Sequence, residues 1–246
     1  MPDNRFTIAL ILLVILGLAT PWALAGSAAG TVVFASGEVK AIDAHGHTRY
    51  LIKGDRVSSG DTVTTDEGKV QIRFTDGGYA SLKANTHYRL SDYVFRDSAG
   101  REDRGFFSLL KGTVRFVTGA IGKAKRKSFH IKTKTATIGI RGSSGLVVSC
   151  VAGSCGARAD GTYLTTYSGI LTIASGSFSG EVLVHETYYC DGTGCVVVNE
   201  DQSALPLAPL IPELDRGYRQ GDQQHIDPGA HTPSQMSPGA ARGSAY

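Results

Sequence analysis

The residue most suited to binding chemistry is Arg141, which stands in the glycine-rich segment 139–145, read as GIRGSSG. Glycines at this density permit a backbone with φ > 0 or the close approach of two strands. A guanidinium held there suits a carboxylate or a phosphate of a ligand. The alternative is an internal strut, paired with a carboxylate such as Asp55 or Asp61. This alternative is favoured, because a cation in a tight strand turn rarely faces solvent as a ligand contact.

A second candidate binding surface is the densest group of basic residues. It comprises Lys123, Lys125, Arg126 and Lys127, and Lys132 and Lys134 follow on one face of the next predicted strand. Such a group could hold an anionic glycan, a lipid headgroup or an acidic protein. The competing interpretation is a solvated loop. Nucleic acid is not expected as a partner, because no aromatic residues are interleaved with the basic ones and the net charge is only +3.

The residue types needed for catalysis or metal binding do not occur at suitable spacings. The segment RGSSG lacks the G-x-S-x-G spacing of a nucleophile elbow, and no His or acid can be assigned to Ser143 or Ser144. His45 and His47 flank a glycine without a partner at a recognisable ligand spacing, which favours a turn over a metal site. We therefore expect a protein that is not an enzyme and needs no cofactor.

Four cysteines form two C-x4-C pairs, Cys150 with Cys155 and Cys190 with Cys195. In a hairpin, residues that flank such a short loop can lie opposite each other, close enough for a disulfide. A four-cysteine zinc site is the alternative, but this spacing is wider than the usual ligand spacing. Two local disulfides are preferred over crossed ones. Each would contribute only about 2 kcal/mol on the loop-entropy model, and so would fix loop shape more than hold the fold.

The N-terminal segment has the pattern of a secretory signal peptide. Arg5 precedes the apolar run Phe6–Ala19, and Ala23-Leu24-Ala25 supplies an A-x-A cleavage site. An uncleaved anchor is disfavoured, because the run is shorter than the roughly 20 residues that a membrane span needs. We expect cleavage after Ala25 and a periplasmic or secreted mature chain with no integral membrane span. An oxidising compartment agrees with the expected disulfides.

The remainder of the chain predicts short strands that position these residues. Residues 69–74 alternate apolar and polar, Asp76-Gly77-Gly78 supplies a turn, and residues 79–83 complete a hairpin. Gly54-Asp55 and Gly60-Asp61 predict two equivalent tight turns, each followed by a short strand. Regular strands without a 3.6-residue period predict an all-β domain, either a sandwich or a short β-solenoid.

Three further segments complete the predicted organisation. Residues 106–117 are expected to be a short helix or strand that breaks at Gly112, followed by a strand. Residues 150–201 continue the strands with the two C-x4-C hairpins and are expected to pack on the same domain. Six of the eight prolines lie beyond residue 201, so that residues 202–246 predict a disordered tail or a tether.

The order of these motifs resembles the FecR-domain family of exported bacterial proteins, over residues 30–149. The segments that carry the resemblance are GTVVFASGEV, LIKGDRVSSGDTVTTDEG, VQIRFTDGGYASLKANT, LLKGTVRFV and TKTATIGIRGSSGLVV. Within them the structural motif residues are Asp55, Asp61, Gly139, Arg141, Gly142 and Ser143. The family usually has Thr where Ser143 stands.

The resemblance implies a strand-rich periplasmic domain that binds or relays rather than catalyses. The founding members are iron-uptake signal relays, with a cytoplasmic anti-sigma segment, one membrane span and this domain outside. Only five residues precede the apolar run here. The chain therefore resembles the stand-alone exported version without an anti-sigma segment, and the transmembrane signalling role is not expected to carry over.

Two functions from different classes agree with these observations. The first is an interaction module of the bacterial envelope that engages a protein or an anionic polymer through its sheet faces or the basic loop. The second is a structural component of the envelope or matrix that self-associates through exposed strands and the proline-rich tail. An enzyme is the least favoured class, because the chemistry-bearing residues are missing.

Overall fold

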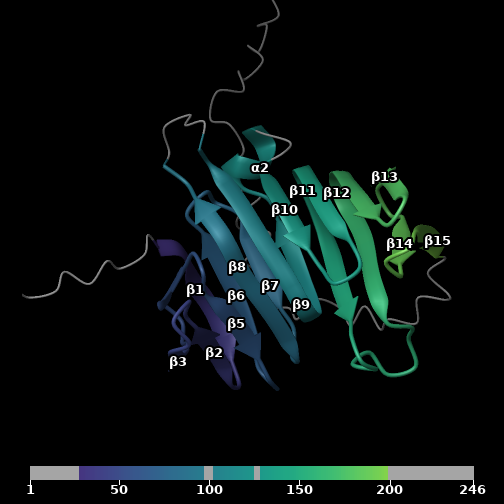
Figure 1. Cartoon of the computed structure of the whole chain (residues 1–246). Helices are drawn as coiled ribbons and strands as arrows, with labels where there is room; N and C mark the ends of the chain where they lie inside the picture. The colour runs from purple at the N-terminus through teal and green to yellow at the C-terminus, as the bar shows by residue number, and fades with distance from the viewer. Residues whose placement is uncertain (1–27, 97–101, 125–127, 199–246) are drawn as a thin grey trace, which may run out of the picture. The chain divides into compact units, whose positions relative to one another are not determined.

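The computed structural model describes residues 28–96, 102–124 and 128–198 (Figure 1). The predicted signal peptide and tail lie outside these ranges, and their assignments stay predictions. Strands make up 63% of the described residues and helix 3%, which confirms the all-β prediction. The fifteen described strands join in one sheet that is not closed.

The strands follow one another with a single short helix among the described residues. In chain order the elements are β1 (Ala28–Ser36), β2 (Val39–Ile42), β3 (Thr48–Tyr50), β4 (Arg56–Ser58), β5 (Thr62–Thr65), β6 (Lys69–Phe74), β7 (Tyr79–Leu82), β8 (Thr86–Val94), β9 (Arg104–Val117), α2 (Ala120–Ala124), β10 (Phe129–Lys132), β11 (Thr137–Cys150), β12 (Gly161–Ser175), β13 (Phe178–Val182), β14 (Thr187–Cys190) and β15 (Cys195–Val198).

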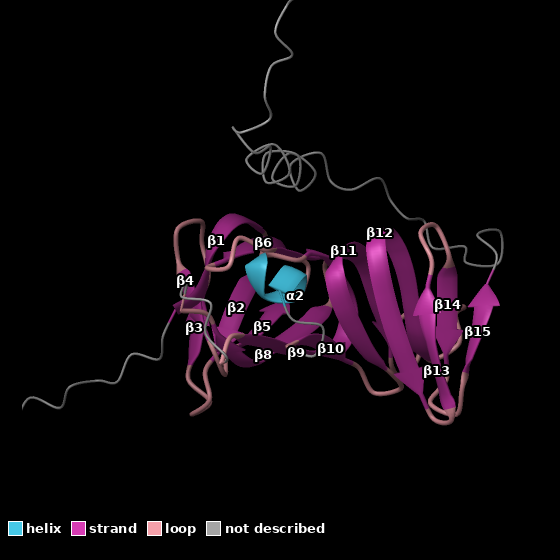
Figure 2. Ribbon diagram, turned by 90° about the horizontal axis from the view of Figure 1, so that it is seen from above, coloured by secondary structure: helices cyan, strands magenta, loops and turns pink. Residues whose placement is uncertain are grey.

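Strand β9 organises the sheet, because its two halves pair with different neighbours. Its first half pairs with β8 and, in parallel, with β10. Its second half pairs with β7 and β11. From β7 the sheet continues through β6 and β1 to β4, and from β8 it continues through β5 and β2 to β3. Two layers therefore diverge from β9 and face each other, with β1 and β6 along one side and β2, β5 and β8 along the other (Figure 2). Two facing layers are the arrangement of a β-sandwich, the first of the two predicted architectures, and not of a β-solenoid.

The core fills the space between these layers. The β6 positions Val70, Ile72 and Phe74, predicted to point inward, are all buried. The ring of Phe107, on β9, lies at the centre, with its centroid 5.1 Å from that of Phe74 and 5.4 Å from that of Tyr88. The β6–β7 hairpin is confirmed, and its strands pair in register around the predicted turn.

Gly112 is the point at which β9 passes from one layer to the other. Residues 106–117 lie within one continuous strand, so the predicted break is wrong, but Gly112 has a φ of +95° and bends the strand. The buried hydroxyl of Thr86 accepts a hydrogen bond from the backbone N–H of Thr113 at 3.0 Å. The connection from β7 to β8 crosses between the layers at this bend, so that a Cβ at Gly112 would lie 2.5 Å from the carbonyl oxygen of Asn85.

The two Gly-Asp turns are equivalent, as predicted. The Asp55 carboxylate accepts a hydrogen bond from the N–H of Ile52, and the Asp61 carboxylate accepts one from the N–H of Ser58, both at 2.8 Å. Gly54 and Gly60 have φ values of +100° and +93°. Each turn leads directly into a short strand, β4 or β5.

Residues 150–198 extend the same sheet. Leu164, Leu171 and Val182 belong to the core cluster that also contains the residues of β6 and β9. Both local disulfides form, Cys150–Cys155 and Cys190–Cys195.

The two disulfides differ in their setting. Cys190 lies directly opposite Cys195 in the β14–β15 hairpin, as expected. Cys150 instead lies opposite Gly161, so the first C-x4-C loop is not a hairpin of its own. It is part of the longer connection between β11 and β12, and its disulfide closes a ring inside that connection.

Candidate functional site

The glycine-rich segment 139–145 forms a bulge in β11. Ile138 and Ile140 point into the core, and the pairing of β11 with β12 shifts register between Arg141 and Ser144. Gly142, at the bulge, has a φ of +59°, which favours glycine. Gly139 leaves room for the hydroxyl oxygen of Thr172, which would lie 2.5 Å from a Cβ at this position.

Ser143 is the buried residue that holds the bulge together. Its hydroxyl shares its one proton between the carbonyl oxygens of Ile170, at 2.6 Å, and Arg141, at 3.0 Å. Its N–H donates to the hydroxyl of Thr118, and its carbonyl accepts from both the N–H and the hydroxyl of Thr118. The side chain and the backbone groups of this one residue therefore connect the end of β9, the bulge and β12.

Arg141 is exposed, so the prediction that it forms an internal strut is wrong. Asp61, offered as a partner of the strut, is bound by Arg49. Asp55 is occupied with its own turn. The side chain of Arg141 is therefore on the surface.

The helix α2 brings a second cation to the bulge. The buried carboxylate of Asp76 accepts hydrogen bonds from the N–H groups of Gly78, at 3.0 Å, and Ile121, at 3.3 Å. Its backbone carbonyl accepts one from Ala120. Burial raises the pKa of the Asp76 carboxyl above its ordinary value. These bonds attach α2 to the β6–β7 turn, and the exposed Lys123 on α2 lies against Gly142, 3.7 Å from the position a Cβ would take there.

We call Lys123 and Arg141 the bulge cluster. None of the ion pairs formed within the described ranges involves either residue. The other members of the predicted basic group, Lys125, Arg126 and Lys127, follow α2 directly in sequence but lie outside the described residues.

The exposed Lys132 and Lys134 do not join the bulge cluster. Lys132 is opposite Thr137 in the β10–β11 ladder. Thr137 is four residues from Arg141, a separation of about 13 Å along a strand. The structure therefore places Lys123 against Gly142, the neighbour of Arg141 in sequence, and separates Arg141 from Lys132.

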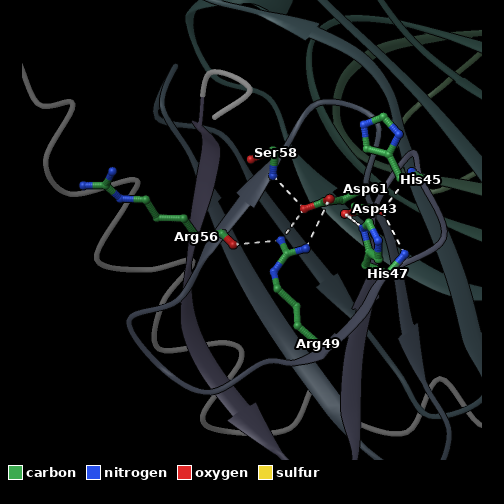
Figure 3. A network of polar contacts seen from close by, with 7 residues as sticks. All are labelled: Asp43, His45, His47, Arg49, Arg56, Ser58 and Asp61. Atoms are coloured by element: carbon green, nitrogen blue, oxygen red, sulfur yellow. Dashed lines mark hydrogen bonds and ion pairs between the residues drawn. The ribbon is translucent and has the colours of Figure 1, made fainter. Parts of the chain in front are cut away.

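A polar network connects β3, β4 and the turn before β5 (Figure 3). The side chain of Asp61 is buried, and its carboxylate accepts hydrogen bonds from the guanidinium of Arg49 and from the N–H of Ser58. Arg49 also donates to the carbonyl of Arg56 at 3.2 Å. The side chain of Arg56 points away from Asp61 in Figure 3. All its donors and acceptors serve the turns, so we assign this network to stability. Nothing in the sequence indicated Arg49 as the partner.

The turn at His45 and His47 is confirmed. The Asp43 carboxylate accepts hydrogen bonds from the N–H groups of His45 and His47, at 2.8 and 2.9 Å, and contacts the ring Nδ1 of His47 at 3.0 Å (Figure 3). These bonds, the N–H of His47 first among them, lower the pKa of the Asp43 carboxyl to about 2. Within the described ranges, no three His, Cys, Asp or Glu side chains are grouped as metal ligands would be.

No helix in the described ranges has the length and apolar character that a membrane crossing requires.

No curated protein matches the chain. Two crystal structures of proposed anti-sigma factors from Parabacteroides distasonis ATCC 8503 are similar to it. The first has 15% sequence identity and a TM-score of 0.43, with 56% of this chain and 59% of that chain covered. The second has 16% identity and a TM-score of 0.43, with 64% and 74% covered. Similarity at this level implies nothing about activity.

A family model provides the assignment. Residues 61–169 match the model described as FecR protein. The match contains β5 to β11, the bulge cluster and most of β12. It begins and ends later than the segment 30–149 whose motifs carried the resemblance. This chain therefore carries a FecR domain over residues 61–169.

Proposed function

We propose that the chain is a non-enzymatic interaction module of the bacterial envelope that binds an anionic polymer or an acidic protein surface through the bulge cluster. The observation that carries this proposal is the placement of Arg141. A cation in the most constrained part of β11 is exposed, Lys123 lies against the adjacent Gly142, and among the described residues neither cation forms an ion pair with an acid. Hydrogen bonds hold the backbone that carries both cations, so that mainly their side chains lose conformational freedom on binding a carboxylate or phosphate.

The basic sequence that follows α2 supports the same ligand class. Lys125, Arg126 and Lys127 add three charges within four residues of Lys123. Adjacent charges of one sign raise the local concentration of an anionic partner and its association rate. The binding is therefore expected to weaken as the salt concentration rises.

An exported location is part of this proposal. It rests on the predicted signal peptide, and the two disulfides are compatible with it, because such bonds persist in oxidising compartments. A binding role also agrees with the described residues, in which the conspicuous polar networks are used for turns rather than for a reactive group.

Charge reversal tests the proposal. We expect Lys123→Glu/Arg141→Glu to weaken binding of an oligouronate by at least about tenfold at low salt, a loss of about 1.4 kcal/mol. Binding is measured by fluorescence anisotropy of a labelled oligouronate, with neutral dextran as the ligand control.

The matched protein control is Lys132→Glu/Lys134→Glu, which makes the same change in net charge at exposed residues away from the bulge. The control should retain most of the affinity. An affinity that is independent of salt, or equal losses in both variants, would show that the bulge cluster is not the binding site. If oligouronate does not bind, the same pair of variants is compared for capture of an acidic protein from envelope extract.

A further inference from the structure

Strand β15 differs from the other strands at the edges of the described sheet. Among the described strands it pairs with β14 alone. Val196 and Val197, on opposite faces of the strand, are 59% and 54% exposed. Natural edge strands are usually protected from pairing by charged residues, proline or bulges. Three other edges follow this rule, since β3 contains Arg49, β4 contains Arg56 and β13 contains Glu181. Strand β15 contains no charge, no proline and no bulge.

Both faces of the sheet carry apolar side chains out to this edge. On the core face, a cross-strand row runs outward through Val147, Leu164, Tyr188 and Val197. On the opposite face, a second row runs through Val148, Tyr163, Tyr189 and Val196. The innermost residues of both rows are buried and the valines at the edge are exposed. A further strand beside β15 would extend both rows.

The free backbone groups of β15 can be assigned from its pairing with β14. The Cα atoms of Cys190 and Cys195 are 4.1 Å apart, which is the close spacing of a non-hydrogen-bonded antiparallel pair. The next pair, Tyr189 and Val196, is then hydrogen-bonded, and the N–H and C=O of Val197 point to the outer edge. The disulfide fixes this hairpin before any partner arrives, which reduces the entropy lost on pairing.

We infer that β15 is the interface of a homodimer, in which two copies pair antiparallel about a two-fold axis at Val197. A second copy is the occupant that fits, because an antiparallel edge presents a donor and an acceptor from the same residue and is therefore its own complement. The axis at Val197 places Val196 of one copy opposite Val198 of the other, so every valine of β15 meets a valine. The absence of charge in β15 means that self-pairing opposes no like charges. This inference is independent of the bulge cluster.

The oligomeric state of the purified protein tests the inference. We expect a monomer–dimer equilibrium by sedimentation velocity, and Val197→Pro should raise its dissociation constant by about 100-fold, because each copy loses an outward donor. Val197→Ala keeps that donor, so it should weaken the dimer less than Val197→Pro does. Near-ultraviolet circular dichroism checks that the variants are folded. A wild-type protein that stays monomeric up to about 1 mM, or a Val197→Pro dimer of unchanged affinity, would overturn the inference.

Cross-linking tests the register without weakening the edge. Hydrogen-bonded pairs have Cα atoms about 5.5 Å apart, within the range that a disulfide spans. We therefore expect Val197→Cys to give a covalent dimer on a non-reducing gel after mild oxidation. Val196→Cys is the matched control, because it faces Val198 of the other copy and should stay largely uncross-linked. The reverse pattern, or no cross-link from either variant, would contradict pairing about Val197.

Discussion

Replacing Gly112 by alanine is expected to cost about 3–4 kcal/mol of the free energy of unfolding. Two effects add at this position. The φ of +95° disfavours any L side chain, at a cost of about 1 kcal/mol. In addition, the new Cβ would lie 2.5 Å from the carbonyl oxygen of Asn85 and 2.6 Å from the Cα of Thr86, and neither backbone atom can move without separating β8 from β9.

Gly54→Ala is the matched control for this variant. Gly54 has a φ of +100°, yet nothing lies within 4 Å of the position that its Cβ would take. We expect a cost of only about 1 kcal/mol, from the backbone alone. The free energy of unfolding of both variants is measured by urea unfolding, followed by far-ultraviolet circular dichroism. Equal losses would mean that the two layers do not meet at Gly112 as described.

Removing the guanidinium of Arg49 is expected to cost about 3 kcal/mol. The Asp61 side chain is only 4% exposed, so Arg49→Met leaves a buried carboxylate without its cation. The hydrogen bond from Ser58 would remain, but one neutral donor does not replace a charged pair. The Arg49 side chain is itself 41% exposed, which keeps the expected loss at the lower end of the range for buried pairs.

Arg56→Met provides the comparison within the same network. Its side chain points away from Asp61, and only its backbone carbonyl takes part, which the substitution retains (Figure 3). A change below about 0.5 kcal/mol in the free energy of unfolding is expected.

Thermal and urea unfolding should also show that the effects of Asp61→Asn and Arg49→Met are non-additive, because both remove the same interaction. Additive losses would argue against a direct ion pair.

The local part of this fold was predictable from sequence. Alternation in residues 69–74 and the Asp-Gly-Gly turn defined the β6–β7 hairpin, because side-chain direction and turn chemistry act over a few residues. The doubled Gly-Asp likewise indicated two equivalent turns. The short cysteine spacing predicted both disulfides.

The long-range part was not predictable in the same way. The partner of Asp61 depends on how β3 and β5 lie on either side of β2, which is a property of the sheet and not of residues 55–61. The two different sets of neighbours around β9 also follow from one bend at Gly112, whose sequence signal is equally compatible with a break.

Arg141 shows how a single bulge decides a functional assignment. The buried Ile138 and Ile140 already place Arg141 on the outer face by simple alternation. Glycine density suggested an internal position instead, and the inference of a strut followed from it. In the structure, the extra residue at the bulge lets Ser143 turn inward while Arg141 stays outside. The alternation was the better guide, because it reflects the core on one side of β11.

A bulge can present exposed side chains for binding on a backbone that stays rigid. Bulges locally release a strand from its ladder and re-aim side chains, while the flanking pairs keep the site rigid. Here Thr118, Ser143 and Asp76 supply that rigidity through hydrogen bonds that do not involve Lys123 or Arg141. Changes in the two cations should therefore alter binding with little effect on stability.

The most direct test of the bulge cluster as a binding surface is amide chemical-shift mapping of the purified, isotope-labelled protein during titration with an oligouronate. If the bulge cluster binds the ligand, the largest shifts occur at Lys123, Arg141, Gly142 and Ser143, and they disappear on adding salt. Shifts confined to the polar network around Asp61, or to β14 and β15, with none at the bulge, would contradict it.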